Sequence, residues 1–456
     1  RLRHLALILP GLLLTLESTT ALAGGAITSG TTVAGTIAGP TFLESWTFSG
    51  TSGQAILIAA VTTSGLVNTN IVLRAPGGAI VVNTSADRTE YTLAATGTFT
   101  IEISDVGLND AGSYAIGFMN VTAGPLTSAG DLNGGPIASS DVVSGTASGP
   151  GDFDAYTFSG TIGQRVLVSG VATAGAGYDT NILLYPPGGG LQEAQSFTGD
   201  LLNFQLTATG TWTIVIEDYG NDVAGSFNLS FLNVTAGPFT NGADPDGGAI
   251  VSNDIKTGTF NAVGDLDAWT FTGAPSQLAL MAAISTGAGT HNTQVMLFPP
   301  AGAAAVVNTT ADRSEFTTNA AGTWTMVVFD VGTNETGTYS LGYLNGTVGP
   351  FTKGSDPNGG PIESNENKSG ITEVACDFDA YRFTGTLNDR IVITATATGG
   401  LGYDTNIVLY PPNGGPQAAQ TFTGDRLDFK LTSTGAWTIV IEDYGNDVPG
   451  NYNFGF

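Results

Sequence analysis

One passage occurs four times along this chain. It is clearest as Gly-Asp-Phe-Asp-Ala-Tyr-Thr-Phe from Gly151, and it recurs from Gly264 and Cys376, with a weaker copy from Thr41. The aromatic residue of the passage is Trp46, Tyr156, Trp269 or Tyr381. Consecutive copies therefore lie about 110 residues apart, which suits independent domains and exceeds the ~20–50 residues of solenoid repeats. The repeat predicts four domains in a row.

Other recurring segments set the limits of these domains. A Gly-Gly pair stands at the same distance before each aromatic residue, and a segment ending in Gly-Pro closes the first three copies. We therefore predict domains at 24–125, 126–238, 239–350 and 351–456, the last truncated at its C-terminal end because it stops before that segment. Since proline stiffens a linker, the short connections predict defined joints and a semi-rigid, elongated rod.

The copies are of two types. The first and third, here called A-type, share Ala-Asp-Arg from Ala86 and Ala311. The second and fourth, here called B-type, share Gly-Tyr-Asp-Thr-Asn-Ile from Gly177 and Gly402, and Ile-Glu-Asp-Tyr-Gly-Asn-Asp-Val from positions 216 and 441. The alternating order implies that a two-domain unit was itself duplicated.

The local pattern predicts β-strands only. Short runs rich in Thr, Val, Ile and aromatic residues alternate with Gly- and Pro-containing turns, and no stretch after the N-terminal segment sustains a helical apolar period. In the second copy we predict strands at 155–158, 165–171, 181–185, 203–206, 211–216 and 226–231. Two packed antiparallel sheets per copy follow, so the fold class is all-β, with four tandem β-sandwich domains.

Residues 1–23 are typical of a secretion signal. Arg1 and Arg3 precede an apolar run from Leu5 to Leu16, and Ala21-Leu22-Ala23 offers small residues for cleavage. The run is shorter than the ~20 residues that span a bilayer. We predict a secreted or cell-surface protein with no membrane span after cleavage.

The amino-acid composition limits the classes of molecule that this protein can bind. The formal net charge is −26, with only 13 Lys and Arg residues, so nucleic acid is excluded as a partner, because phosphate binding needs basic clusters. Cations are the natural counterions, although acidity can equally serve solubility. Cys376 is the only cysteine, which rules out an intramolecular disulfide. Domains of this size would gain stability from another cross-link, such as a bound metal ion.

Acidic residues recur at two places in each later copy. One pair opens the strand that carries the repeated passage, on one face because its members are two residues apart. The other lies in the preceding linker. Calcium takes six to eight oxygen ligands, and both groups together predict a calcium site at each joint. The alternative is that each residue caps a turn. The candidate ligands are Asp131, Asn133, Asp152, Asp154, Asp244, Asp246, Asp265, Asp267, Asp356, Asn358, Asp377 and Asp379.

At this point the second and fourth copies resemble a known family. The pattern Asp-x-Asp-Ala-Tyr-x-Phe from Asp152, then Tyr-Asp-Thr-Asn-Ile, then Thr-Trp-Thr-Ile-Val-Ile-x-Asp-Tyr-Gly, is similar to the bacterial pre-peptidase C-terminal (PPC) domain. The third copy is less similar, and in the first Phe42 and Glu44 replace the two aspartates. The resemblance implies jelly-roll-like sandwiches of exported proteins, some of which bind calcium or insoluble polymers.

A second constellation belongs to the B-type copies. If their loops converge, tyrosine faces would lie beside carboxylates, as in carbohydrate sites; the alternative is that ordinary loops were duplicated. The candidate residues are Tyr178, Asp179, Asp218, Tyr219, Asp222, Tyr403, Asp404, Asp443, Tyr444 and Asp447.

Signals for catalysis are absent from the sequence. His291 is the only histidine outside residues 1–23, and we expect it in a surface loop; no metalloprotease, nucleophile-elbow or phosphate-loop motif occurs. We predict a secreted, non-enzymatic binding or spacer module, adhesive to extracellular polysaccharide or matrix protein and stabilised by calcium. The alternatives are a self-associating subunit of a sheath, filament or surface layer, and an accessory region of a secreted hydrolase.

Overall fold

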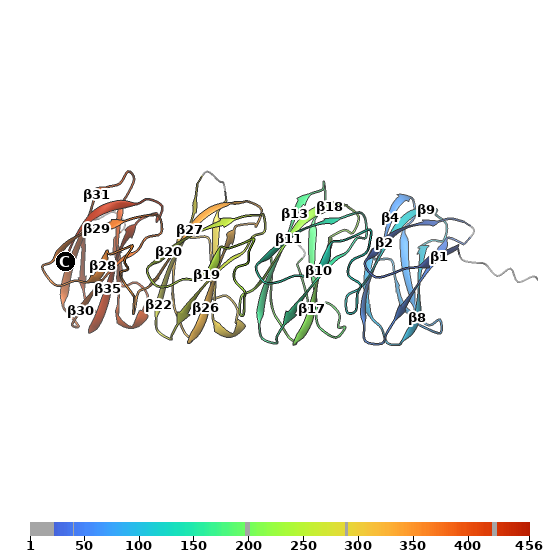
Figure 1. Cartoon of the computed structure of the whole chain (residues 1–456), viewed down its shortest axis with the longest axis horizontal. Helices are drawn as coiled ribbons and strands as arrows, with labels where there is room; N and C mark the ends of the chain where they lie inside the picture. The colour runs from blue at the N-terminus through green and yellow to red at the C-terminus, as the bar shows by residue number, and fades with distance from the viewer. Residues whose placement is uncertain (1–21, 40, 197–200, 288–290, 422–425) are drawn as a thin grey trace, which may run out of the picture.

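The computed structural model describes residues 22–39, 41–196, 201–287, 291–421 and 426–456, and these form four β-sandwiches in a row (Figure 1). Besides strands they contain two single-turn 3-10 helices, η1 (Pro300–Gly302) and η2 (Pro412–Gly414). Most of the predicted secretion signal, residues 1–21, lies outside the described residues. Within the described ranges, no helix has the length and apolar character needed to cross a bilayer.

The described residues of each domain form nine strands. Domain 1 has β1 (Leu22–Ala26), β2 (Thr31–Ile37), β3 (Leu43–Gly50), β4 (Ala55–Gly65), β5 (Thr69–Arg74), β6 (Ile80–Thr84), β7 (Arg88–Thr92), β8 (Gly97–Asp105) and β9 (Gly112–Asn120). Domain 2 has β10 (Gly134–Pro136), β11 (Asp141–Ala147), β12 (Asp154–Gly160), β13 (Arg165–Ala174), β14 (Thr180–Tyr185), β15 (Ala194–Ser196), β16 (Leu201–Gln205), β17 (Gly210–Asp218) and β18 (Gly225–Asn233).

The second half repeats this series. Domain 3 has β19 (Gly247–Ala249), β20 (Asp254–Phe260), β21 (Asp267–Gly273), β22 (Leu278–Thr286), β23 (Thr293–Phe298), β24 (Val307–Thr309), β25 (Arg313–Thr317), β26 (Gly322–Asp330) and β27 (Gly337–Asn345). Domain 4 has β28 (Gly359–Pro361), β29 (Asn367–Thr372), β30 (Asp379–Gly385), β31 (Arg390–Gly399), β32 (Thr405–Tyr410), β33 (Ala419–Thr421), β34 (Arg426–Lys430), β35 (Gly435–Asp443) and β36 (Gly450–Gly455).

All four sandwiches share one topology. In domain 2 a five-stranded sheet has the order β10-β12-β17-β14-β15, and a four-stranded sheet has the order β11-β18-β13-β16. Every pair is antiparallel except the first, β10 with β12, which is parallel. The parallel pair departs from the expected purely antiparallel sheets: the Gly-Gly strand approaches from the preceding domain and runs beside the strand that opens the repeated passage.

All six strands predicted in the second copy are present in domain 2, with ends shifted by a few residues. The three that the sequence pattern missed are β10, β11 and β15. Two of them have only three residues, and β11 consists of Asp-Val-Val-Ser-Gly-Thr-Ala, which has few apolar side chains to signal a strand.

Every domain encloses its own core between its two sheets. Trp212, Trp324 and Trp437 are fully buried at the centres of domains 2, 3 and 4, and Phe99 takes the same position in domain 1. These cores confirm the all-β tandem architecture predicted from the sequence.

A second set of apolar layers lies between the domains. At the first joint Leu57 and Met119, from the four-stranded sheet of domain 1, pack against Leu183 and Val215, from the five-stranded sheet of domain 2. The other two joints have corresponding clusters. A threonine hydroxyl also crosses each joint to a backbone carbonyl, as from Thr213 to Val121 at 2.8 Å. The sheets are therefore stacked face to face along the whole row, which explains the runs of apolar residues buried on both faces.

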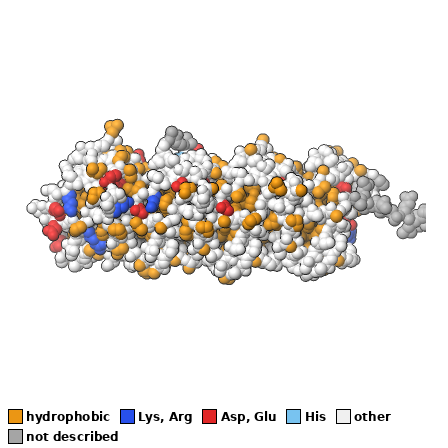
Figure 2. All heavy atoms as spheres, in the orientation of Figure 1, with side chains coloured by type: hydrophobic (Ala, Val, Ile, Leu, Met, Phe, Trp, Pro, Cys, Tyr) orange, Lys and Arg blue, Asp and Glu red, His pale blue; other side chains and the backbone are white. Residues whose placement is uncertain are grey.

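The two end faces differ from these joints. All six residues of β14, in the interior of the row, are buried, whereas the equivalent β5 of domain 1 alternates buried and partly exposed residues. Likewise β13 is buried over most of its length, but β31 alternates from Arg390 onward. Both ends of the stack are therefore more polar than the faces joined inside it. Figure 2 views the rod from its side, where Lys and Arg side chains gather over domain 4 and near its joint with domain 3.

Candidate metal centres at the domain joints

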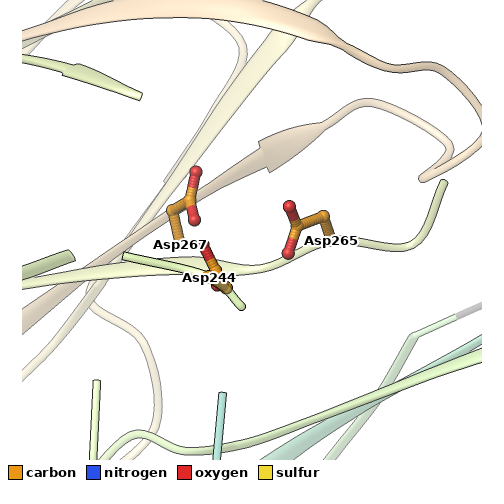
Figure 3. Close-up of side chains that lie close together, drawn as sticks. All are labelled: Asp244, Asp265 and Asp267. Atoms are coloured by element: carbon orange, nitrogen blue, oxygen red, sulfur yellow. The ribbon is translucent and has the colours of Figure 1, made fainter. Parts of the chain in front are cut away.

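Three aspartates from two separate segments meet in domain 3. One carboxylate oxygen from each of Asp244, Asp265 and Asp267 lies within 4.8 Å of the other two, and all three residues are buried. Figure 3 shows the carboxylate of Asp265 directed towards those of Asp244 and Asp267. The linker group and the strand group, which the sequence placed in one predicted calcium site, are therefore in contact range.

The local backbone sets each of these side chains. Asp244 lies in a turn of the linker, where Asn241 Oδ1 accepts hydrogen bonds from Ala243 and Asp244 backbone N–H groups at 2.6 and 2.7 Å. Asp267 is the first residue of β21. Gly264 has φ of +86°, a left-handed conformation that turns the chain into the strand. Asp265, directly after it, accepts hydrogen bonds from Asn261 and Leu266 N–H groups at 2.8 and 2.9 Å.

The strand aspartates carry oxygens that the protein leaves without partners. Both carboxylate oxygens of Asp154 and Asp267, and Oδ1 of Asp379, are buried and accept no hydrogen bond. An uncompensated buried carboxylate costs several kcal/mol. Burial, followed by the charges of neighbouring aspartates, raises the pKa of Asp154 to about 9 and that of Asp267 to about 10. A cation is the partner that would remove this cost at neutral pH.

Domain 4 repeats the arrangement. Asp356, Asp377 and Asp379 meet the same distance criterion and are buried. Asp379 Oδ2 accepts a hydrogen bond from the Tyr452 hydroxyl at 2.7 Å, and Asp356 Oδ2 accepts one from Asn253 Nδ2 of domain 3 at 2.5 Å. Burial raises the pKa of Asp377 to about 8 and that of Asp379 well above its ordinary value.

Domain 2 contains the same residues in a looser arrangement. Among the described residues, the triads of domains 3 and 4 meet the 4.8 Å criterion and the set Asp131, Asp152 and Asp154 does not. Asp152 Oδ1 accepts a hydrogen bond from the Thr32 hydroxyl of domain 1 at 3.1 Å. Oδ2 of Asp131 is buried without a partner, and burial raises the pKa of this residue. We therefore treat it as a weaker candidate.

The second polar residue of each linker lies outside these triads. Asn133 Nδ2 donates to the Thr146 carbonyl and Asn358 Nδ2 to the Ile371 carbonyl, both at 3.0 Å, while Asp246 Oδ2 accepts from Thr259 N–H at 2.9 Å. These three side chains tie the linker to the neighbouring strand. They differ from the turn caps considered as the alternative to calcium, because Asn133 and Asn358 donate to strand carbonyls and Asp246 accepts from a strand N–H group.

Domain 1 has a single glutamate, Glu44, at the position equivalent to the strand aspartate of the triads. Glu44 stands where domains 2 to 4 have the strand aspartate, and its Oε2 accepts hydrogen bonds from Thr36 N–H at 3.0 Å and the Tyr114 hydroxyl at 2.7 Å. Trp46 Nε1 donates to that same hydroxyl at 2.7 Å. Protein groups alone thus satisfy this carboxylate.

The donor set decides which cation the triads suit. Each triad offers only carboxylate oxygens, which hard cations prefer, and neither contains a histidine or cysteine. Calcium tolerates irregular coordination with backbone and water oxygens completing it, whereas magnesium requires near-octahedral geometry. The residues present therefore fit calcium.

The loops of the B-type domains separate into buried and exposed residues. Tyr178 and Tyr403 belong to the hydrophobic cores. Asp218 Oδ1 accepts from Asp179 N–H at 3.1 Å and its Oδ2 from Asp222 N–H at 3.0 Å, so this carboxylate caps the loop, as Asp443 does with Asp404 and Asp447. The side chains at the surface are Asp179, Asp222, Asp404 and Asp447, with Tyr219 54% and Tyr444 53% exposed.

His291 is buried, contrary to the expected surface position. Its ring packs edge-on against Phe260 at 5.7 Å between centroids, and Nε2 lies 2.9 Å from the Thr338 carbonyl. It occupies the core position that Tyr178 has in domain 2, where a tyrosine or histidine ring fills the end of the sandwich. The expectation was wrong because a lone polar ring in a loop segment gives no burial signal.

Two of the joints contain a buried ion pair that was not predicted from the sequence. Arg88 of domain 1 contacts Glu217 of domain 2 at 2.7 Å, and Arg313 of domain 3 contacts Glu442 of domain 4 at 3.1 Å. The alternating order of A-type and B-type domains was the signal that could have predicted it. Because the A-type Ala-Asp-Arg and the B-type Ile-Glu-Asp-Tyr occur in successive domains, they can meet across a joint.

Comparisons with known proteins found structural likeness only. No family model and no curated protein matches the chain. The PPC domain of a collagenase from Bacillus anthracis aligns at 19% identity over 22% of this chain and 95% of its own length, with a TM-score of 0.19. A periplasmic lysozyme inhibitor from Aeromonas hydrophila aligns at 20% identity over 22% and 97%, TM-score 0.19. The CUB1-EGF-CUB2 region of human MASP-1/3 aligns at 9% identity over 44% and 98%, TM-score 0.14.

Proposed function

We propose that this protein is an exported, non-enzymatic rod that acts as a spacer and binding module at a bacterial cell surface or in the extracellular matrix, and that calcium stabilises it. The observation that carries the proposal is the pair of buried aspartate triads with unpartnered oxygens, placed where each domain joins the one before it.

The stacked joints support the spacer role. Apolar sheet-on-sheet layers restrict bending between neighbours, because a packed apolar interface resists the relative motion expected of small polar ones. A rod of four such domains holds its two ends apart at a fixed distance, which is what a spacer requires.

The proposed calcium sites lie near the joints between domains, where an ion would stiffen the rod. Each triad joins a linker aspartate to the first residue of a strand, and its neighbours reach back to the previous domain, as Asn253 does to Asp356. An ion bound there would fix the linker to the sandwich. High calcium outside cells would keep the rod assembled, and a net charge of −26 would attract the ion.

Head-to-tail assembly into a filament is less well supported. Stacking of one copy on the next would bring the outer sheet of domain 4 onto that of domain 1. Those faces carry Arg390 and Thr394 on one side and Arg74, paired with Glu102, on the other, where inner joints have apolar side chains. The polar end faces therefore favour a single rod.

Two measurements test the proposal. Small-angle scattering in calcium should give the profile of a stiff rod, and chelation should increase its flexibility. Co-sedimentation with insoluble cellulose, chitin and fibrillar collagen should retain the protein on at least one of them. A flexible chain in calcium would remove the spacer role, and failure to sediment with all three materials would remove the binding role.

A further inference from the structure

A groove lies where domain 4 meets domain 3, next to the ion pair of that joint. It has a volume of about 560 Å³. Domain 3 lines it with Asp312, Arg313 and Glu315, at the start of β25, and domain 4 lines it from the loop after β35 and the segment around β33. The groove therefore exists only because an A-type domain is followed by a B-type domain.

The joint between domains 1 and 2 brings the same residues together. The lining residues of the groove recur 225 positions earlier, with Thr89 in place of Ser314 as the one difference. Arg88 contacts Glu217 at 2.7 Å, as Arg313 contacts Glu442 at 3.1 Å. The chain therefore carries two copies of one polar arrangement.

A chain of amides forms the base of the arrangement. Gln417 Nε2 donates to Gln420 Oε1 at 3.1 Å, Gln420 Nε2 to Asn406 Oδ1 at 3.2 Å, and Asn406 Nδ2 to Glu442 Oε1 at 2.6 Å. The first joint has the same order at 2.8, 3.1 and 2.6 Å. Because each amide is held by the next, the donors and acceptors along the groove have fixed directions.

A buried asparagine oxygen in each copy has no partner. Asn446 lines the groove, is almost completely buried, and its Oδ1 accepts no hydrogen bond; Asn221 Oδ1 at the first joint is in the same state. Its conformation is fixed, since the backbone carbonyl of Asn446 accepts from Cys376 N–H at 2.8 Å, and that of Asn221 from Gly151 N–H at 2.7 Å. A buried acceptor without a donor costs about 1–3 kcal/mol, and a ligand hydroxyl would supply the missing donor.

Charge and shape indicate what kind of ligand carries that hydroxyl. Among the described residues that line the groove, Arg313 is the single cation; it is neutralised by Glu442 and lies 3.6 Å from Glu315, so these residues offer no free positive charge to an anion. Tyr444, 53% exposed, stands at the rim and presents an aromatic ring. Amides, carboxylates and a rim tyrosine are the groups that hydrogen-bond the hydroxyls and stack on the C–H face of a neutral sugar.

The joint between domains 2 and 3 serves as an internal control. At the equivalent positions Leu201 replaces the arginine and Phe329 replaces the glutamate, and both belong to an apolar cluster with Met296. Val331 stands in place of the tyrosine. An apolar filling thus suffices to stack two domains, as expected because buried ion pairs rarely stabilise more than packed apolar groups. The polar arrangement at the other joints is therefore not needed for stacking.

We infer that the polar arrangement at each A-to-B joint binds a neutral oligosaccharide, with the rim tyrosine stacked on one sugar ring and the amide chain and buried asparagine hydrogen-bonded to hydroxyls. The inference rests on the binding role proposed above and gives that role a ligand class and a place. Two identical sites on one stiff rod would also engage a single polysaccharide together, which multiplies the apparent affinity.

Calorimetric titration of the whole chain in calcium with cellohexaose, chitohexaose and mannohexaose tests the inference. At least one of them should bind at two equivalent sites. Tyr219→Ala or Tyr444→Ala should each remove one site, with at least about a tenfold loss of affinity there, and Tyr444→Phe should retain binding. Val331→Ala is the matched control at the apolar joint and should change nothing. Unchanged melting of each variant shows that it is folded.

Two results would overturn the inference: no binding of any of the three sugars, or full binding by the double variant Tyr219→Ala and Tyr444→Ala. Co-sedimentation separates this failure from that of the proposed function. If the double variant is retained on cellulose, chitin or collagen as well as the unaltered protein, the groove is not the site but the binding role stands. If the unaltered protein is retained on none of them, the binding role itself fails.

Discussion

Domains 1 and 3 place a carboxylate at the same point of the same fold and satisfy it in different ways. In domain 1 Glu44 receives hydrogen bonds from Thr36 N–H and the Tyr114 hydroxyl. In domain 3 the shorter Asp267 leaves both oxygens unpartnered beside two more aspartates. Protein donors satisfy the glutamate of domain 1, whereas the strand aspartates of domains 3 and 4 lie beside two more acids and keep at least one buried oxygen without a partner, although Asp379 accepts a hydrogen bond from the Tyr452 hydroxyl.

The contrast teaches that a metal site can be recognised by buried carboxylate oxygens for which the protein provides no hydrogen-bond donor. Both carboxylates are placed by the same strand pairing, β3 with β8 and β21 with β26. The backbone therefore does not distinguish them. The number of acids and the lack of donors do, and the following predictions are designed to break or sharpen that distinction.

Removal of calcium should have the largest effect. A ligand present at 100 times its Kd stabilises a domain by about 2.7 kcal/mol, which corresponds to a shift of roughly 10–20 °C for a domain of about 100 residues. Chelation should therefore lower the melting of domains 3 and 4 and spare domain 1. Hydrogen exchange followed domain by domain measures this. Equal loss of protection in domain 1 would show that the effect does not come from the triads.

The effect of Asp267→Asn on the stability of domain 3 should have opposite signs in chelator and in calcium. In chelator at neutral pH, a folded-state pKa of about 10 means that Asp267 must take up a proton on folding. Asparagine is neutral in both states and avoids that cost, so we expect domain 3 to gain about 1–3 kcal/mol. In calcium the same variant should lose the stabilisation by the ion. Asp246→Asn is the matched control, because Asp246 lies outside the triad and bonds to Thr259 N–H. Calcium melting curves of both variants decide the point, and identical responses would be evidence against the triad.

Stability in chelator should fall as the pH rises. Burial raises the pKa of Asp267 to about 10 and that of Asp244 to about 7. The folded form therefore binds more protons than the unfolded form between about pH 4 and these values, and stability present at low pH is lost across that window. From about pH 5 to about pH 8 the loss should exceed ~1.4 kcal/mol, the value of one pKa unit.

Calcium should flatten this pH dependence, because the ion holds the carboxylates in their charged form. Denaturant melts at both pH values, with calcium and with chelator, measure the difference. Stability that rises with pH in chelator would mean that these carboxylates are already compensated by the protein.

Glu44→Gln should have the smallest effect. The amide oxygen can still accept from Thr36 N–H and the Tyr114 hydroxyl, but without the charge each bond weakens, and we expect a cost of about 1 kcal/mol. The cost should be the same in calcium and in chelator. A calcium-dependent cost, measured by the same denaturant melts, would place a metal in domain 1 and erase its contrast with domain 3.

Much of the fold could be predicted from the sequence. The repeats at Trp46, Tyr156, Trp269 and Tyr381 predicted four domains, and all four have the expected sandwich. The stacked joints were not predicted, although the sequence of β14 gives some indication of them. Its residues Thr-Asn-Ile-Leu-Leu-Tyr include apolar side chains on both faces, whereas the equivalent β5 ends in Arg74. A run of this kind indicates a strand covered on both sides, but not which surface covers it.

The candidate site was predictable in part for a similar reason. Spacing placed Asp265 and Asp267 on one strand end, and their recurrence with Asp244 indicated a common site; in the structure these three carboxylates lie close together. Spacing could not show that Asp246 bonds to the backbone of β20, because adjacent acids in a linker differ only in the direction of their side chains. The polar arrangement at the A-to-B joints could not be predicted either, because the residues that meet there, such as Arg88 and Glu217, lie 129 positions apart in the sequence.

Calorimetric titration of the metal-free chain with calcium tests the central claim most directly. The account predicts at least two sites, one for each of the two complete triads, with one lost in Asp267→Asn and another in Asp379→Asn. Absence of binding heat in the unaltered chain, or the same number of sites in the double variant, would contradict it.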